Sequence, residues 1–303
     1  AQDAPEADNL PDGISSWCQG IDSEKQDEWP IDQSDGGCDD QPRCPNREMD
    51  RRQTPEIEIL AADAISDSGV ELWNLYEQRG IENVIVVGVH TNMCVLGRPF
   101  GLRQLAKNGK NVVLVRDMTD TMYNSRSAPR VSHFTGTDLV IEHIEKYWCP
   151  TITSTDLLDK PAFRFQEDER PRIAFIVSDD HYDADKTLPV FAQMLRDRYS
   201  CDCSMLHGEG EADIRHTAEL ETAACLVLYI RRLALPKSQL DRIRTHVHSG
   251  RPLVALRTAN HAFAARYKYT EGYQTPEGRA EWPEFDAEVL GGNYHGHGPN
   301  QLG

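Results

Sequence analysis

The stretch Asn83-Val-Ile-Val-Val-Gly-Val-His-Thr-Asn-Met-Cys-Val95 decides the fold that the sequence predicts. Residues 84–89 are mostly β-branched and interrupted only by Gly88, which is typical of a strand buried on both faces of a parallel sheet. Apolar residues then recur at helical spacing, and Pro99 favours a kink or a late helix start. We therefore expect a strand, a short polar turn and a helix, with Cys94 at the junction.

A cysteine at a strand-to-helix junction has a distinctive chemical setting. Free backbone N–H groups and the positive end of a helix lower the pKa of a thiol and stabilise an oxyanion. A cysteine nucleophile needs this environment. A free cysteine is also often a small buried apolar residue, and the sequence alone reveals no histidine partner. The residues themselves leave both interpretations of Cys94 open.

Strand and helix patterns alternate along two parts of the chain. This alternation predicts two doubly wound, mostly parallel three-layer α/β/α domains in tandem. We expect the first domain over residues 1–158, with 1–55 irregular, a charged linker at 159–171, and the second domain over 172–303. The expected strands are 57–60, 84–89, 112–115, 151–153, 173–177, 204–206, 225–230 and 252–256. The expected helices are 70–79, 137–147, 188–199, 217–222 and 236–248.

The composition excludes several classes of partner. A net charge of -17 over 303 residues argues against nucleic acids and anionic membranes, because either would need a basic face. No apolar run reaches the length of a membrane span. We therefore expect a small-molecule substrate, and the composition leaves homo-oligomer formation open. The N-terminus lacks Met and a signal peptide, so we expect it to be incomplete, and the compartment (periplasmic, secreted or cytoplasmic) stays open.

Polar residues follow the expected strands of the second domain. In open α/β sheets, ligands bind beyond the carboxyl ends of the strands, which here carry Asp179, His181 and Arg257. His261, with His295 and His297 in a Gly-rich loop, could bind a metal or a sugar hydroxyl. Histidines at this spacing are more often surface loop residues, so we expect no metal and no cofactor.

The first half of the chain resembles the isochorismatase-like cysteine hydrolases. The resemblance rests on Gly88-Val-His-Thr-Asn-Met-Cys-Val95, on residues 79–81 and on residues 109–117, and covers about residues 57–155. It implies hydrolysis of a small amide- or ester-like bond. The implied site residues are Cys94 as nucleophile, the backbone N–H groups of Met93 and Cys94 as oxyanion hole, a cis peptide between His90 and Thr91, and the neighbouring Asn92.

The sequence departs from this family at two places. The family's first strand ends in an aspartate that deprotonates the thiol, and no apolar strand precedes residue 57, so we expect the chain to be truncated there. The family's lysine has no counterpart near Ala62-Asp63; Arg51, Arg52 or Arg79 would be the replacement cation, although arginine carries protons poorly. Two hypotheses follow: a cysteine hydrolase, or a catalytically inactive ligand-binding or scaffold protein that retains both folds.

The second half resembles the ThuA-like (trehalose-utilisation) domains, which are related to class I glutamine amidotransferases. The resemblance rests on residues 250–263 and 290–297 and covers about residues 171–303. The relatives place a nucleophilic cysteine on the turn that here reads Arg257-Thr-Ala-Asn260, so glutaminase chemistry is not expected. The resemblance implies a carbohydrate-related role and a C-terminally incomplete domain.

Overall fold

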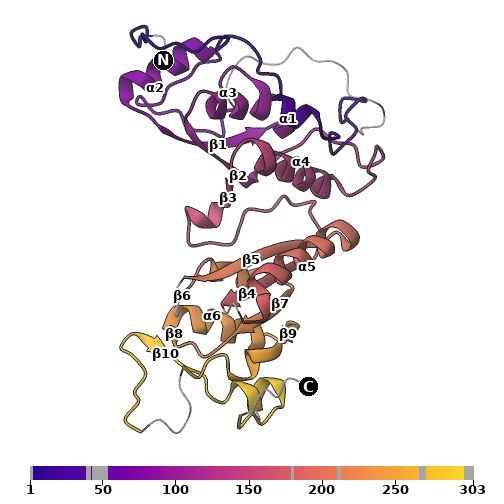
Figure 1. The fold of residues 1–303 in the computed structure, drawn as a ribbon, viewed down its shortest axis with the longest axis vertical. Coiled ribbons are helices and arrows are strands. Elements are labelled where there is room, and N and C mark those ends of the chain that lie inside the picture. The colour runs from indigo at the N-terminus through magenta and orange to yellow at the C-terminus, as the bar shows by residue number, and fades with distance from the viewer. Residues whose placement is uncertain are drawn as a thin grey trace. The chain divides into compact units, whose positions relative to one another are not determined.

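The computed structural model of the chain describes residues 3–38, 42, 54–178, 181–209, 213–265 and 271–296. The chain divides into two compact units, residues 1–153 and residues 154–303, and each is described by itself. Both units mix helices with parallel strands (Figure 1). The mixed α/β class is thus confirmed, whereas the tandem-domain boundaries and the linker stay predictions.

The first unit contains a three-stranded parallel sheet. Its strands are β1 (Asn83–Val89), β2 (Asn111–Asp120) and β3 (Thr151–Ile152), in the order β1-β2-β3. Its helices are α1 (Asp22–Lys25), α2 (Gly69–Arg79), α3 (Leu102–Lys107) and α4 (His133–Tyr147). The late start of α3, after Pro99, follows the expectation from the sequence.

Local sequence signals explain the limits of α2. The Ser68 side chain accepts a hydrogen bond from the Glu71 N–H at 3.3 Å and so caps the first turn. Gly80 ends the helix in the left-handed conformation, with φ of 61°, which glycine adopts without steric cost. The helix expected over residues 70–79 is therefore confirmed, with Gly80 as its stop.

The core of the first unit lies on one face of the sheet. Val112 and Leu114 of β2 pack there against apolar residues of α3 and α4. On the other face, Ile85, Val87 and Val89 are 53%, 51% and 58% exposed. The prediction that this strand is buried on both faces is therefore wrong for the described structure. The reason is that the described helices pack on the opposite face of the sheet, and no described element covers this one.

The expected strand at residues 57–60 does not form. These residues adopt turn and irregular backbone, and the side chains of Ile57, Ile59 and Leu60 are exposed. A short apolar run becomes a strand only where a neighbouring strand completes its ladder. Within the described residues, β1 has a strand partner on one edge only.

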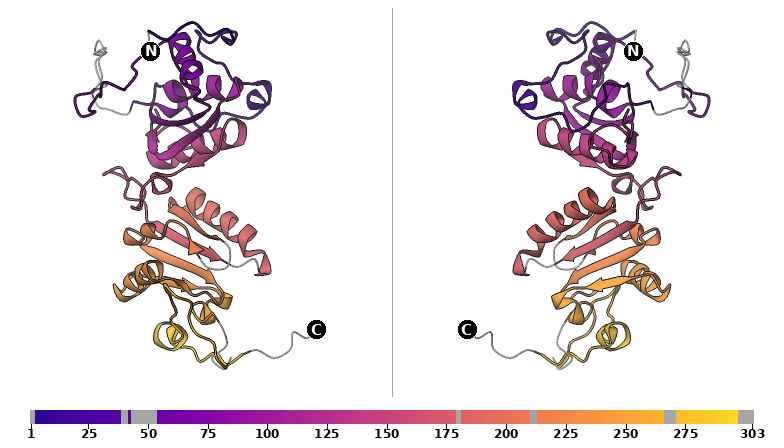
Figure 2. Two further views of the ribbon diagram at one scale, coloured as in Figure 1. Left: turned by 90° about the vertical axis from the view of Figure 1, so that its left-hand side faces the viewer. Right: turned by 90° about the vertical axis from the view of Figure 1, so that its right-hand side faces the viewer.

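The second unit is a doubly wound sheet covered on both faces. The strand order is β6-β5-β4-β7-β9, with only β6 antiparallel to its neighbour. Helices α5 (Ala184–Tyr199) and α6 (Lys237–His248) lie on opposite faces of this sheet (Figure 2), over separate apolar clusters. The strands are β4 (Arg172–Ser178), β5 (Asp202–Glu209), β6 (Asp213–Ile214), β7 (Cys225–Ile230) and β9 (Leu253–Ala255).

Shorter elements complete this unit. A two-stranded antiparallel ladder joins β8 (Leu235–Pro236) to β10 (Arg279–Ala280). The segment expected as a helix at 217–222 is a 3-10 helix, η4 (Thr217–Glu221). The first strand β4 has its sequential successors on either side, so the switch point of the sheet lies at the carboxyl ends of β4 and its neighbours.

Candidate active site

Cys94 lies in a π-helical turn, η1 (Thr91–Val95), that follows β1 directly. The carboxyl ends of β1 and β2 lie side by side, because Val89 is the register partner of Asp120. The Cys94 residue is half-buried, and the preceding Met93 is exposed. The turn thus presents the thiol at the carboxyl edge of the first sheet.

A non-proline cis peptide precedes the turn. It joins Val89 to His90, not His90 to Thr91 as the family resemblance implied. The strand extends through Val89, so the cis bond falls at the boundary between strand and turn. The expected cis peptide is therefore present but lies one residue earlier.

A hydroxyl chain anchors the first residue of the turn. Thr91 is fully buried, and its Oγ1 lies 2.6 Å from Oγ1 of Thr119. Thr119 donates its single hydroxyl proton to the Gly88 carbonyl oxygen at 2.7 Å, so it must accept from Thr91. Thr91 thereby attaches the turn to β2, so its role is structural.

Asn92 ties the same turn to two loops. Its Oδ1 accepts from the Met122 N–H at 3.0 Å, and its Nδ2 donates to the Met122 carbonyl at 3.0 Å and to Gln33 Oε1 at 2.6 Å. Both backbone groups of Met122 are thus satisfied by one side chain. Asn92, predicted as a site residue, holds the loops around Cys94 in place.

The backbone amides of the turn bear on the predicted oxyanion hole. The His90 carbonyl accepts from the Met93 N–H at 3.1 Å and from the Val95 N–H at 3.0 Å. A substrate oxyanion at Met93 would therefore compete with a bond inside the turn. The oxyanion hole at Met93 and Cys94 stays a prediction.

Residues 33–37 of the irregular N-terminal segment lie beside the turn and form a packed wall next to it. Asp35 accepts from the Gly37 N–H at 2.8 Å, from Asn124 Nδ2 at 2.8 Å and from Ser127 Oγ at 3.0 Å. The backbone bond from Gly37, then the Asn124 bond, hold the pKa of Asp35 below its usual range. Residues 33–37 are therefore fixed against the loop that follows β2.

Sequence reasoning missed a histidine–aspartate pair at the same edge of the sheet. His133 Nε2 lies 2.7 Å from Oδ1 of Asp120, and His133 Nδ1 lies 2.9 Å from the Tyr123 carbonyl oxygen. His133 is the first residue of α4, directly after the cap Ser132. Because a carbonyl only accepts, Nδ1 carries a proton, and the imidazolium form satisfies both contacts. The one signal in the sequence was Ser132, a residue type that favours the N-cap position and so indicates that a helix begins at His133.

The buried lysine of the first unit cannot serve Cys94. Lys110 Nζ lies 3.0 Å from Glu77 and 3.0 Å from Glu82, next to the amino end of β2. Burial lowers the pKa of Lys110, but these two hydrogen bonds outweigh it and raise that pKa. Arg79 ends α2, ahead of β1, and so also lies at the amino edge, roughly 20 Å along the strand from Cys94. Arg79 as replacement cation is therefore wrong, and Arg51 and Arg52 lie outside the described residues.

The second unit brings some of its candidate residues to the carboxyl edge of its sheet. The Arg257 guanidinium lies 4.4 Å from the ring centroid of Tyr182, in the segment after β4. The hydrogen bond with Tyr182 raises the pKa of Arg257 above its usual value. The two residues join the loops after β9 and β4 across the switch point.

The candidate histidines of this unit differ in their surroundings. His261 stacks on Tyr294 with ring centroids 4.7 Å apart, and its Nδ1 lies 2.6 Å from Asn260 Oδ1. His295 is exposed in the same loop as Tyr294. Asp179 and His297 lie outside the described residues, and only the backbone of His181 is described. Within the described part of the chain, no three His, Cys, Asp or Glu side chains gather as a metal site.

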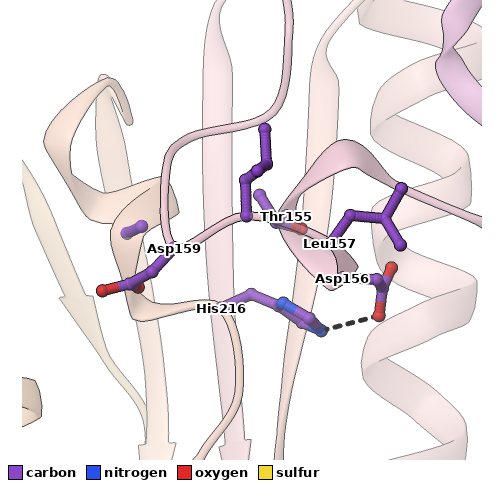
Figure 3. A pocket seen from close by; sticks show the side chains of 7 residues that line it. Thr155, Asp156, Leu157, Asp159 and His216 are labelled. Atoms are coloured by element: carbon purple, nitrogen blue, oxygen red, sulfur yellow. Dashed lines mark ion pairs between the residues drawn. The ribbon is translucent and has the colours of Figure 1, made fainter.

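A small pocket lies elsewhere in the second unit. It has a volume of about 200 Å³, and His216 and Asp156 form an ion pair of 3.2 Å in its wall (Figure 3). None of the residues predicted from the sequence contributes to it. The lining residues are Thr155, Asp156, Leu157, Leu158, Asp159, His216 and Ala218.

Comparison with known proteins bears on the first unit. Residues 41–140 match the family model of the isochorismatase domain. No curated protein and no solved structure matched the chain. The matched range includes β1, the whole Cys94 turn and β2, so the first unit contains an isochorismatase-like part. No helix in the described residues is long and apolar enough to cross a membrane.

Proposed function

We propose that the first unit is a cysteine hydrolase that cleaves a small amide- or ester-like bond. The observation that carries the proposal is the match over residues 41–140, and it is supported by the position of Cys94 in the turn that follows β1. The hydroxyl chain of Thr91 and the amide clamp of Asn92 hold this turn to the end of β2. Such fixation is what an attacking thiolate needs, because misplacement by 1 Å is costly to catalysis.

The reaction has two covalent steps. Cys94 Sγ forms a bond to the acyl carbon, the C–N or C–O bond breaks, and the leaving amine or alcohol takes up the thiol proton. Water then attacks the thioester, giving a carboxylic acid and restoring the thiol. The backbone N–H groups at Met93 and Cys94 would stabilise the oxyanion in each step if the Met93 amide leaves the His90 carbonyl.

Trapping of the acyl-enzyme tests this proposal. The full chain is mixed with small activated esters of varied acyl size, quenched with acid and digested. We expect the acyl mass on the peptide that contains Cys94, and no such adduct in the Cys94→Ser variant. Acylation that falls equally on the other cysteines, or none at Cys94, would overturn the proposal.

The second hypothesis, an inactive ligand-binding or scaffold protein, is favoured by one observation. No lysine lies in the described segments that border the Cys94 turn, at residues 31–37 and 119–128. This hypothesis predicts that Cys94→Ser changes neither hydrolysis nor ligand affinity. Assays of hydrolysis and of ligand-induced thermal shift, carried out on the wild type and on Cys94→Ser, distinguish the two hypotheses.

For the second unit we propose a ThuA-like, carbohydrate-related binding role. Its support is the carboxyl edge, where the faces of Tyr182 and Tyr294 and the donors of Arg257 are of the kind that hold sugar rings and hydroxyls. Calorimetric titration of the full chain with disaccharides such as trehalose tests the proposal. We expect binding that Tyr294→Ala weakens, and no heat with any sugar would overturn it.

A further inference from the structure

We propose that Asp120 and His133 serve Cys94 as its proton acceptor and its cation. Asp120 is the catalytic residue that takes the thiol proton, and His133 is a positioning residue that acts through Asp120. The inference rests on the proposed hydrolase function. It names the acid–base groups of that site from residues of this chain.

Three cross-links place Asp120 beside the Cys94 turn. Val89 pairs with Asp120 in the strand register, Thr91 bonds to the residue before Asp120, and Asn92 clamps Met122, two residues after it. The segments 89–92 and 119–122 therefore run together, and Cys94 follows by two residues. Helix α4, which begins with His133, also packs against this turn.

The charge arrangement suits a thiol nucleophile. Such a group needs a base for its proton and a nearby positive charge that stabilises the thiolate. The 2.7 Å contact with Asp120 and the 2.9 Å contact with the Tyr123 carbonyl favour the imidazolium form of His133. His133 is also the first residue of α4, so the positive end of that helix favours a nearby thiolate, although it opposes the charge on His133 itself, which the Asp120 carboxylate must offset. The side chains of Asp120 and His133 are 29% and 35% exposed, so a small substrate can reach them.

A neighbouring hydroxyl supports a polar site at this place. Thr121, the residue after Asp120, is 1% exposed, and its Oγ1 makes no hydrogen bond within the described residues. A buried hydroxyl without a protein partner is rare and suggests a water or ligand partner. Thr121 thus adds an unused polar group to the edge that holds Asp120.

Asp120 gives away every proton that it takes up within one catalytic cycle. Asp120 takes the proton of the Cys94 thiol as the C–S bond forms, and then gives it to the leaving nitrogen or oxygen. In the second step Asp120 takes a proton from the attacking water and returns it to the Cys94 sulfur as the thioester breaks. The imidazolium of His133 keeps its proton throughout and orients the carboxylate.

Alkylation of Cys94 tests the pair without any substrate. Iodoacetamide is added to native full-length chain at neutral pH, and the rate is read from the Cys94 peptide by mass spectrometry. We expect Asp120→Asn and His133→Gln each to slow alkylation of Cys94 about tenfold. The first variant removes the proton acceptor and the anionic partner of His133, and the second removes the cation that stabilises the thiolate. His133→Lys, which keeps a cationic donor, is expected to recover most of the rate.

Two controls make the outcome decisive. Glu145→Gln removes a carboxylate that pairs with Arg116 from the far end of the same helix, and should leave the Cys94 rate unchanged. The part of the thiolate absorbance that disappears in Cys94→Ser belongs to Cys94. This signal should decrease together with the alkylation rate in the Asp120 and His133 variants, while their melting temperatures stay unchanged. A wild-type rate no faster than that of glutathione would overturn the hydrolase proposal itself. A fast wild-type rate that both variants retain would overturn only the Asp120–His133 pair.

Discussion

The hydroxyl chain under the Cys94 turn predicts unequal costs for two similar substitutions. In Thr91→Val, Thr119 keeps its bond to the Gly88 carbonyl and loses only an incoming donor. One buried bond between neutral groups is lost, so we expect a loss of about 1 kcal/mol in the free energy of unfolding. In Thr119→Val, both the Gly88 carbonyl and the buried Thr91 hydroxyl lose their partner. Two groups are left unsatisfied, and we expect the free energy of unfolding to fall by about 2–4 kcal/mol.

Urea unfolding followed by tryptophan fluorescence measures this difference. Four of the five tryptophans, Trp17, Trp29, Trp73 and Trp148, belong to the first unit, so the signal reports mainly on that unit. The double variant should cost no more than Thr119→Val by itself plus a few tenths of a kcal/mol, because both changes break the same chain. Equal costs for the two single variants, or a larger cost for Thr91→Val, would refute the assigned direction of the hydroxyl bonds.

Three further predictions concern other parts of the chain. Desolvation lowers the pKa of the buried His246 from 6.5, so the unfolded chain takes up a proton at a higher pH than the folded chain does. The stabilisation is therefore complete above pH 6.5 and should fall as the pH drops below it. Urea unfolding followed by far-UV circular dichroism at several pH values measures this, and His246→Gln should flatten the dependence relative to wild type. Gly37→Ala places a Cβ 2.4 Å from the Met122 carbonyl carbon at a φ of 71°, and should release the N-terminal segment to limited proteolysis, whereas a wild-type digestion pattern would count against the packed wall. Burial raises the pKa of Cys149 to about 11, so its peptide should stay unalkylated in native protein at pH 8, and labelling as fast as in urea would contradict that burial.

The sequence predicted those elements whose signals are local. Gly80 ends α2 because a left-handed residue is needed there, and Pro99 delays α3 until Leu102. The apolar run at 225–230 forms β7, a strand of the doubly wound sheet of the second unit. Each of these features depends on residues within one or two turns of itself, which is the range over which propensity and periodicity act.

The sequence could not predict features that depend on distant neighbours. The exposed face of β1 reflects the lack of a described element packed on that side, which no pattern within residues 83–89 reveals. Asp35 meets Asn124 across 89 residues of chain, and Asp120 meets His133 only once the loop after β2 turns back. Such pairs follow from strand register and loop path, and so the sequence predicted the Cys94 turn but not the Asp120–His133 pair at the same edge of the sheet.

The most direct test of the central claim compares the reactivity of Cys94 in the folded and the unfolded chain. The site account predicts that iodoacetamide alkylates the Cys94 peptide of the native full-length chain at pH 7 at least tenfold faster than the same peptide in urea, although the folded residue is half-buried. The buried Cys149 should show the opposite ratio in the same digest. A Cys94 that reacts more slowly in the folded chain than in urea would contradict the account, because burial without activation describes a structural cysteine.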